Sequence, residues 1–311
     1  MTVRPTRDLP GAPALPRTRD QRPPPVARNW VGAMLGGSVV ATAVLRGGTS
    51  SSVHVIAVRL PGGSTVRAVI RRYVQPAQLA DEPDVVAREA AVLRWMEGRG
   101  VPTPELVAAD PTGVEAGVPS LLMSVVPGRV EERPADRDGW LRRLAETLPL
   151  IHATPAPPAE VVLPYAVYRQ RSDEPPRWTR RPALWVRAVA AARGPVPATA
   201  ATLLHRDYHP GNVLWRRGRI SGVVDWQAAQ LGPPAADAGH CRMNLLGRGL
   251  ECADRFTAHW EEVSGEVYDP FFDLAAIVGR LDDLRDQRPT HAPAIEEALF
   301  RALATRHGRP R

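Results

Sequence analysis

Asp207, Asn212 and Asp225 are the side chains of this sequence whose types and spacing best suit chemistry. The stretch between the last two predicts a β-hairpin with a two-residue loop at Gly218-Arg219, because a type II′ turn places Gly first. This loop would pair Asn212 directly with Asp225, with their Cβ atoms roughly 5 Å apart on one face. An amide oxygen and a carboxylate at that separation can hold Mg²⁺. Asp207, just upstream, would reach a molecule held beside the metal.

The order Asp, Asn, Asp indicates phosphoryl transfer, since it is the order of catalytic base, first metal ligand and second metal ligand in kinases. The two strings that carry these residues are His205-Arg206-Asp207-Tyr208-His209-Pro210-Gly211-Asn212-Val213-Leu214 and Val224-Asp225-Trp226. They resemble the H-x-D-x-H-P-G-N-x-[LI] and [VI]-D-W motifs of the aminoglycoside phosphotransferase (APH) and choline-kinase-like family of small-molecule kinases. The resemblance extends over nearly the whole chain from about Val31 and is strongest over 204–239.

Two other interpretations of the same stretch remain open. His205, Asp207, His209 and Asp225 are all metal-ligand types, so they could serve a metal-dependent phosphohydrolase. Pro210-Gly211-Asn212 has no purpose in that interpretation, whereas in a kinase His205 packs behind the Asp225 turn and His209 shapes the loop. A nucleotide-binding pseudokinase would have the fold without turnover, but the intact base and metal ligands oppose it.

The composition is ordinary for a globular protein, with 44% hydrophobic and 23% charged residues in a chain of 311. The basic residues are more unusual, because the sequence contains no lysine and all 40 are arginine, with a formal net charge of +7. They are scattered through every segment instead of forming one arm or stripe. We therefore expect no nucleic-acid partner.

Cys241 and Cys252 have neither metal-ligand spacing nor the number needed for a disulfide framework, so we expect buried thiols in a cytoplasmic protein. The uncharged run Trp30–Leu45 imitates a signal peptide, but it is glycine-containing and preceded by a long tail of mixed charge. It is also short for a membrane span. We expect it to form a short helix followed by a first strand.

Alternating apolar residues and turn signals predict an antiparallel sheet with one helix in the first part of the chain. The expected strands are Val39–Leu45, Val53–Val58, Val66–Tyr73 and Leu121–Val126, and the expected helix is Pro83–Gly98. The turn before the second strand contains Gly47, Gly48 and Ser50. Such a turn can offer backbone N–H groups to phosphates, although a Gly-Gly turn is often only a turn.

The resemblance places a phosphate-binding cation on the third strand, where this chain offers Arg71 in the absence of lysine. Arg72 points to the opposite face. Glu89 on the following helix would pair with Arg71, as in kinases. The alternative is two solvated arginines at a strand end. The resemblance also implies a hinge at which backbone groups near Met123, Ser124 and Val125 meet the nucleotide base.

Downstream, the resemblance assigns Asp237 to bracing the catalytic loop through backbone hydrogen bonds, while Pro233 stands where the family has its first Asp. Segment 154–197 is rich in Pro, Arg and Trp and has no clear assignment; its aromatic residues either line an acceptor pocket or form local core. The remaining expected helices are Asp138–His152, His240–Leu245, Cys252–Val263, Phe271–Leu284 and Ile295–Thr305.

The resemblance implies an α+β, two-lobed protein-kinase-like fold with a five-stranded antiparallel β-sheet N-lobe and a mainly helical C-lobe. The expected divisions are a disordered tail at 1–28, a nucleotide-binding N-lobe at 29–126 and a catalytic C-lobe at 127–311. The predicted activity is transfer of the γ-phosphate of ATP or GTP, with Mg²⁺, to a hydroxyl of a small molecule, which could be an aminoglycoside-like antibiotic, an amino alcohol or a sugar. We expect no membrane partner, and a monomer or homodimer.

Overall fold

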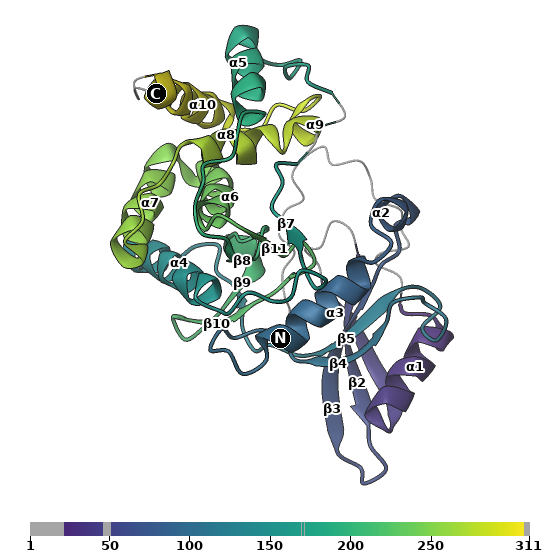
Figure 1. Cartoon of the computed structure of the whole chain (residues 1–311). Helices are drawn as coiled ribbons and strands as arrows, with labels where there is room; N and C mark the ends of the chain where they lie inside the picture. The colour runs from purple at the N-terminus through teal and green to yellow at the C-terminus, as the bar shows by residue number, and fades with distance from the viewer. Residues whose placement is uncertain (1–21, 46–50, 169, 171, 308–311) are drawn as a thin grey trace. The chain divides into compact units, whose positions relative to one another are not determined.

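A computed structural model describes residues 22–45, 51–168, 170 and 172–307 of the chain. The chain forms two compact units, the first reaching Gly98 and including Pro102–Pro127, the second comprising Arg99–Val101 and the chain from Gly128 onward. Figure 1 shows the first unit in purple and blue and the second in teal to yellow. Each unit is described by itself below.

The first unit is built on one five-stranded antiparallel sheet with strand order β1-β2-β3-β5-β4. Its strands are β1 (Ser38–Val44), β2 (Ser52–Arg59), β3 (Thr65–Arg72), β4 (Leu106–Asp110) and β5 (Ser120–Ser124). Strands β1, β2, β3 and β5 lie within a residue or two of the four strands expected from the sequence. The bounds of β4 were not assigned from the sequence, because its short apolar run is flanked by prolines.

Helix α1 (Pro25–Leu35) packs on one face of this sheet. Trp30 and Val31 form a buried cluster with Ile56 of β2 and Ile70 of β3. The helix begins with Pro at its first position and ends at Gly36, whose φ of 68° suits glycine. The expected tail at 1–28 therefore overlaps the helix by four residues, because proline at the start of a helix stabilises it instead of breaking it.

Helices α2 (Pro76–Asp81) and α3 (Val85–Met96) follow the third strand. Side chains alternate along β3, so Ile70 and Arg72 share the face under α1, while Arg71 points to the other face, toward α3. Figure 1 shows α1 and α3 on opposite sides of the sheet. Most of α3 is buried, including Glu89, which is 1% exposed.

The second unit contains two small three-stranded sheets. One has the order β10-β9-β6 and the other the order β7-β11-β8. The strands are β6 (Arg129–Val130), β7 (Leu163–Pro164), β8 (Thr202–Leu204), β9 (Val213–Arg216), β10 (Arg219–Val223) and β11 (Gln230–Gly232). A short 3₁₀ turn, η2 (Pro210–Asn212), leads directly into β9.

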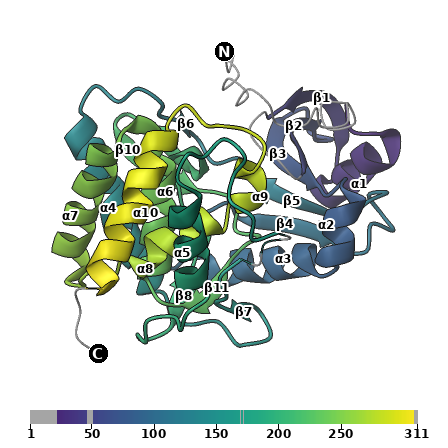
Figure 2. The same ribbon diagram turned by 90° about the horizontal axis from the view of Figure 1, so that it is seen from above.

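Helices are the main regular elements of the second unit, and α5, α8 and α10 pack side by side, as Figure 2 shows. The helices are α4 (Arg137–His152), α5 (Pro182–Ala192), α6 (Ala235–Leu245), α7 (Leu250–Ser264), α8 (Phe271–Val278), α9 (Leu281–Leu284) and α10 (Ala292–His307). The single helix expected over Phe271–Leu284 is broken at Gly279-Arg280. With a sheet in one unit and mainly helices in the other, the predicted α+β fold is confirmed.

Aromatic side chains from distant parts of the sequence fill the core of the second unit. Trp185 on α5 is fully buried, and Trp178 packs edge-on against it with ring centroids 5.8 Å apart. Burying a large apolar side chain contributes about 1.5–3 kcal/mol. These two tryptophans of segment 154–197 are therefore local core, not an exposed pocket lining.

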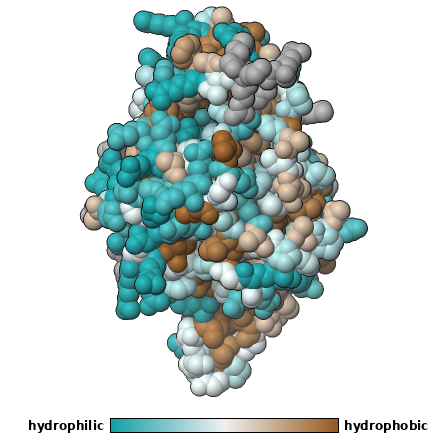
Figure 3. Space-filling view, turned by 60° about the vertical axis from the view of Figure 1, so that its left-hand side comes forward, coloured by the Kyte–Doolittle hydropathy of each residue, from teal (hydrophilic) through white to brown (hydrophobic). Residues whose placement is uncertain are grey.

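Both cysteines are free thiols and buried, as predicted, and Cys241 on α6 has no exposed surface. Burial raises the pKa of the Cys241 thiol well above its usual range. None of the helices that the structure describes is long and apolar enough to cross a membrane. On the face drawn in Figure 3, hydrophilic residues predominate and hydrophobic ones form small separate groups, as on ordinary protein surfaces.

Candidate active site

The loop that follows β8 is held at its backbone by one buried carboxylate. Asp237, in the first turn of α6, accepts the backbone N–H of His205 at 2.9 Å and that of Arg206 at 2.7 Å. His152 of α4 lies 3.1 Å from the same carboxylate. Asp237 has no exposed surface. These are the loop-bracing hydrogen bonds expected of Asp237, and they fix the backbone immediately before Asp207.

Arg206 adopts a left-handed backbone conformation with φ 68°, which is rare for a residue other than glycine. Its Nε donates to Gln230 at 2.7 Å and its NH2 group donates to the carbonyl of Ala166 at 2.8 Å. The guanidinium also lies 4.6 Å from the ring centroid of Tyr165 and 4.3 Å from that of Tyr168. The loop is therefore tied to the segment that carries these two tyrosines.

Asp207 lies between two partners and is about a third exposed, at 34% of its side chain. Its Oδ2 accepts a hydrogen bond from Nδ2 of Asn212 at 2.9 Å, and Nε2 of His240 lies 2.9 Å from Oδ1. Burial alone would raise the pKa of Asp207. Contact with His240 and the neighbouring histidines outweighs burial and holds this pKa well below its usual range. Asp207 is thus an oriented, ionised carboxylate.

The predicted hairpin exists, but its predicted register is wrong. The loop is Arg217-Gly218, with φ values of 52° and 72°, which makes it a type I′ turn. A bulge between Ile220 and Gly222 shifts the pairing again, so that Val213 faces Val223.

Asn212 consequently lies opposite Val224, and the N–H of Val224 donates to the backbone carbonyl of Asn212 at 2.9 Å. Asp225 is one residue further along and leaves the ladder in a left-handed conformation, with φ 71°. The two residues are near neighbours on adjoining stretches, not the directly opposed pair that the sequence predicted.

The oxygen chemistry of Asn212 and Asp225 nevertheless fits Mg²⁺. Both hydrogens of the Asn212 amide point toward Asp207, because Nδ2 donates to its backbone carbonyl and to its carboxylate. The amide oxygen of Asn212 is thereby directed away from Asp207. An amide oxygen together with a carboxylate is the hard donor set that Mg²⁺ prefers.

The histidines of the motif make contacts that are compatible with the structural roles predicted for them in a kinase. His205 packs on Trp226 with ring centroids 4.6 Å apart, and its Nε2 lies 3.0 Å from the carbonyl of Val224. Its other ring nitrogen accepts the N–H of Asp207 at 3.3 Å. Nδ1 of His209 accepts the N–H of Gly211 at 3.0 Å, and burial lowers the pKa of His209 to about 4.

Both ring nitrogens of His205 are therefore engaged by backbone groups, which opposes the phosphohydrolase interpretation. In the described part of the chain, no three His, Cys, Asp or Glu side chains are grouped as metal ligands.

In the first unit, Arg71 and Glu89 form a buried ion pair. NH1 of Arg71 lies 3.0 Å from Oε1 of Glu89, and the two side chains are 6% and 2% exposed. Nε of Arg71 donates to Oγ of Ser51 at 2.9 Å, and the hydroxyl of Tyr73 donates to Glu89. Arg72 is also buried, at 8% exposed. The alternative of two solvated arginines is therefore wrong.

The remaining residues predicted to contact the nucleotide have mixed outcomes. Gly47, Gly48 and Ser50 lie outside the described residues. Met123 is a buried part of β5. Ser124 donates its N–H to the carbonyl of Glu105 at 2.8 Å, so that group is already used within the sheet. Val125 follows the last residue of β5.

Sequence reasoning missed His240, His152 and the contacts of Arg206. The only signal for His240 was its position three residues after Asp237 on one helix, which places both side chains on the same helix face. Nothing in the sequence indicated that this face meets Asp207. His152 was assigned only as the last residue of a core helix.

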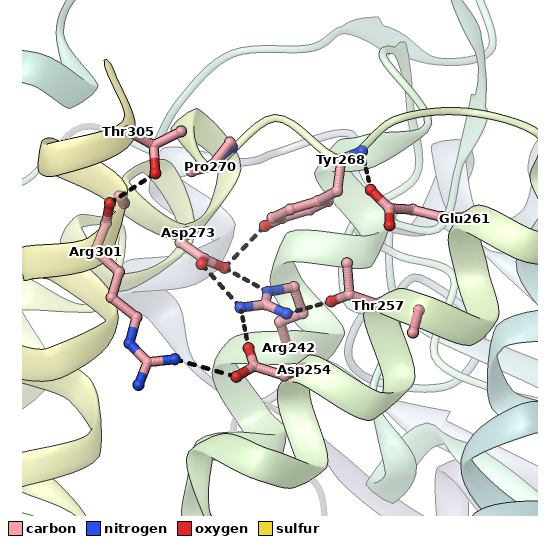
Figure 4. Close-up of a pocket in the computed structure, with 11 residues that line it drawn as sticks. Arg242, Asp254, Thr257, Glu261, Tyr268, Pro270, Asp273, Arg301 and Thr305 are labelled. Carbon is pink, nitrogen blue, oxygen red and sulfur yellow. Dashed lines mark hydrogen bonds and ion pairs between the residues drawn. The ribbon is translucent and has the colours of Figure 1, made fainter. Parts of the chain in front are cut away.

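A polar cavity of about 290 Å³ lies among α6, α7, α8 and α10 and contains none of the predicted site residues (Figure 4). Arg242 crosses it and donates to Asp273 at 2.9 and 3.1 Å and to Asp254 at 3.3 Å. Burial would lower the pKa of Arg242, but Asp273 outweighs burial and raises it. Because these charges are paired with one another, the network is a structural link among helices α6, α7, α8 and α10.

Comparison with known proteins places the chain in a family. Residues 43–274 match the phosphotransferase enzyme family, APH. The chain is 26% identical over 245 residues to an N-acetylmuramate/N-acetylglucosamine kinase of Caulobacter vibrioides. This match covers 70% of the chain and spans 64% of the length of that kinase, which is less than two thirds.

Solved structures share the fold at lower identity. A ternary complex of aminoglycoside phosphotransferase APH(4)-Ia with ADP and hygromycin B is 17% identical with a TM-score of 0.59, covering 91% of this chain and 99% of that one. A macrolide 2′-phosphotransferase type I is 19% identical with a TM-score of 0.57, covering 86% and 94%. The predicted kinase-like fold is confirmed, and the chain belongs to the APH phosphotransferase enzyme family.

Proposed function

We propose that this protein transfers the γ-phosphate of ATP to a hydroxyl group of a small molecule, with Mg²⁺ as the metal and GTP as an alternative donor. The observation that carries the proposal is the state of Asp207, an ionised and partly exposed carboxylate held by Asn212. It occupies the catalytic-base position of the family motif.

In the proposed reaction, the oxygen of the acceptor hydroxyl attacks the γ-phosphorus and the bond from that phosphorus to the β-phosphate oxygen breaks. Asp207 orients the hydroxyl and accepts its proton as the new P–O bond forms, and ADP leaves. Phosphoryl transfer needs positioning and charge neutralisation more than a strong base. The lowered pKa of Asp207 is therefore compatible with this task.

Asn212 and Asp225 would hold the metal, which supplies charge neutralisation at the phosphates. Arg71, fixed by Glu89 and Ser51, is proposed as the cation for the α- and β-phosphates. A guanidinium can bind phosphate through two parallel N–H bonds, whereas an ammonium acts as a point charge. Gly47, Gly48, Ser50 and the backbone near Met123, Ser124 and Val125 remain proposed nucleotide contacts.

The acceptor classes suggested by the relatives are an amino sugar, an aminoglycoside and a macrolide. We further propose a cytoplasmic protein that acts as a monomer or homodimer.

The test is ADP release by the purified chain with ATP and Mg²⁺ across a panel of acceptors: N-acetylglucosamine, N-acetylmuramate, hygromycin B, a macrolide and choline. We expect release above the rate with water for one class, with one added phosphoryl group found by mass spectrometry. Asp207→Asn is the matched control. ADP release no greater than that of the control for every acceptor would contradict transfer and favour a pseudokinase. Cleavage of a phosphoester without ATP would favour the phosphohydrolase instead.

A further inference from the structure

Each oxygen of the Asp207 carboxylate has a contact from a different element of the second unit. Asn212, in η2, donates to Oδ2 at 2.9 Å. His240, in α6, lies 2.9 Å from Oδ1. Asn212 belongs to the family motif, whereas His240 lies outside it, so the second contact is a property of this chain that the motif does not predict.

His240 is placed to donate to Asp207 through Nε2. The residue is 6% exposed, and its buried Nε2 has no well-aligned hydrogen-bond acceptor among the described residues. A buried N–H without a partner costs about 1–3 kcal/mol, which favours the small rotation that directs it at Oδ1. The other nearby imidazole, His209, is 3.8 Å from the same oxygen, too far for a hydrogen bond.

Helix α6 therefore contacts the catalytic loop at two successive levels. Asp237, in its first turn, holds the backbone N–H groups of His205 and Arg206. His240, three residues later and on the same helix face, reaches the side chain of the next loop residue. The helix thus fixes the position of the loop and also the rotation of the Asp207 carboxylate.

We propose that His240 is a positioning residue that, through Nε2–H, holds Oδ1 of Asp207 and keeps the carboxylate turned toward the acceptor hydroxyl. This inference rests on the proposed function, because it assigns His240 an effect on the reaction through Asp207. Asn212 would restrain one oxygen and His240 the other, so that losing either contact frees the carboxylate to rotate.

The test compares His240→Ala with His259→Ala. His259 is a matched control because it is also a buried histidine, 5% exposed, with Nε2 2.9 Å from the carboxylate of Asp138. Supporting groups of this kind typically change activity by about 10–100-fold. We expect kcat to fall by about that factor in His240→Ala only, with KM for ATP within about twofold of the parent, since orientation affects the transition state.

His240→Gln separates the hydrogen bond from packing, because its amide N–H can reach about as far as Nε2 of histidine. We expect kcat within about fivefold of the parent, since the donor is restored. Each variant is first checked by its thermal unfolding midpoint and its KM for ATP. Rates are measured with the acceptor found in the panel above, and as ADP release to water.

Equal kcat in the parent, His240→Ala and His259→Ala would overturn the inference and leave the proposed function intact. If His240→Ala does not fold, a folded His240→Gln with a kcat reduced about 100-fold would overturn it as well, because the donor would then be irrelevant. A parent chain without ADP release, to any acceptor or to water, would overturn both proposals.

Discussion

The Arg71–Glu89 pair and the Asp207 carboxylate are two charged centres that are stabilised in opposite ways. In the first unit, Arg71 and Glu89 neutralise each other within the core, with side chains only 6% and 2% exposed. In the second, Asp207 remains 34% exposed and is held by side chains that need not carry a full positive charge. The first arrangement commits the ion pair to the fold, because either charge alone would be costly to bury. The second leaves an ion available to a substrate.

The comparison predicts that stability and activity can be changed separately. Asp207→Asn removes the proton acceptor while preserving shape, so we expect kcat to fall by about 10²–10⁴-fold, the usual contribution of a general base. The free energy of unfolding should change less than in the Glu89→Gln variant described below, because the Asp207 carboxylate is partly exposed and solvent screens its contacts. Steady-state kinetics and urea unfolding of the same preparation measure both. A large loss of stability with little loss of kcat would break the comparison.

Glu89→Gln should instead lower the free energy of unfolding strongly. It leaves Arg71 charged and buried without its counterion, which is expected to lower the free energy of unfolding by about 3–5 kcal/mol. The matched control is Asp84→Asn, which removes the partner of Arg88 in an ion pair whose carboxylate is 58% exposed and should cost less than about 1 kcal/mol.

Hydrogen exchange of α3 and β3 amides would locate the effect of Glu89→Gln. Replacing both residues of the pair with Met should recover much of the loss, because no unpaired charge remains. Equal destabilisation by Glu89→Gln and Asp84→Asn would show that the buried pair is not committed to the fold.

How far the sequence could predict these two centres differs as well. The Arg71–Glu89 pair was predicted from the family resemblance, and strand alternation and helix periodicity indicated only the face on which each side chain lies. The contact between His240 and Asp207 depends on how a helix packs against a loop 33 residues away in sequence. No local sequence pattern predicts how that helix packs against the loop.

The hairpin register shows a second limit. The sequence prediction placed Gly218 first in the turn, but Arg217 takes that position with φ 52°. Arginine gives no sign that it will adopt a left-handed conformation. The bulge before Gly222 then shifts the pairing once more. Presence of the hairpin was predictable from composition, whereas its register depended on two backbone choices that side-chain patterns do not encode.

Asp237 can be compared with Asp207 within the second unit, because its carboxylate is fully buried whereas that of Asp207 is partly exposed. Burial would raise the pKa of Asp237, but the hydrogen bonds from His152 and from the backbone N–H of His205, together with the electrostatic effect of these two residues, outweigh burial and hold the pKa below its usual range. Its contribution to stability is therefore fully present above the unfolded pKa of about 3.9 and is lost as pH falls through the lower folded pKa.

We expect Asp237→Asn to lower the free energy of unfolding by about 1–3 kcal/mol at pH 7, because one loop N–H loses its acceptor. The difference from the parent should shrink below about pH 4, where the unfolded parent takes up the proton. Urea unfolding at a series of pH values measures it. A difference that grows on acidification would show that Asp237 is protonated in the folded protein.

The smallest effect is expected in the hairpin. Arg217→Asn supplies a residue that type I′ turns prefer, so we expect a gain of about 0.5–1 kcal/mol. Arg216→Asn, one residue earlier and inside β9, should instead be neutral or destabilising. Neither change should alter the hydrogen exchange of β3 and α3. A loss of stability in Arg217→Asn would favour the turn at Gly218-Arg219 that the sequence predicted.

The reactivity of the Cys241 thiol can be used to measure local opening of the second unit around α6. Its thiol is adjacent to His240, has no exposed surface and has a raised pKa, so a thiol reagent can react with it only while α6 is transiently open. The rate of labelling in the native protein therefore reports the free energy of that local opening. Because α6 also carries Asp237 and His240, the same rate measures how often the catalytic loop is released.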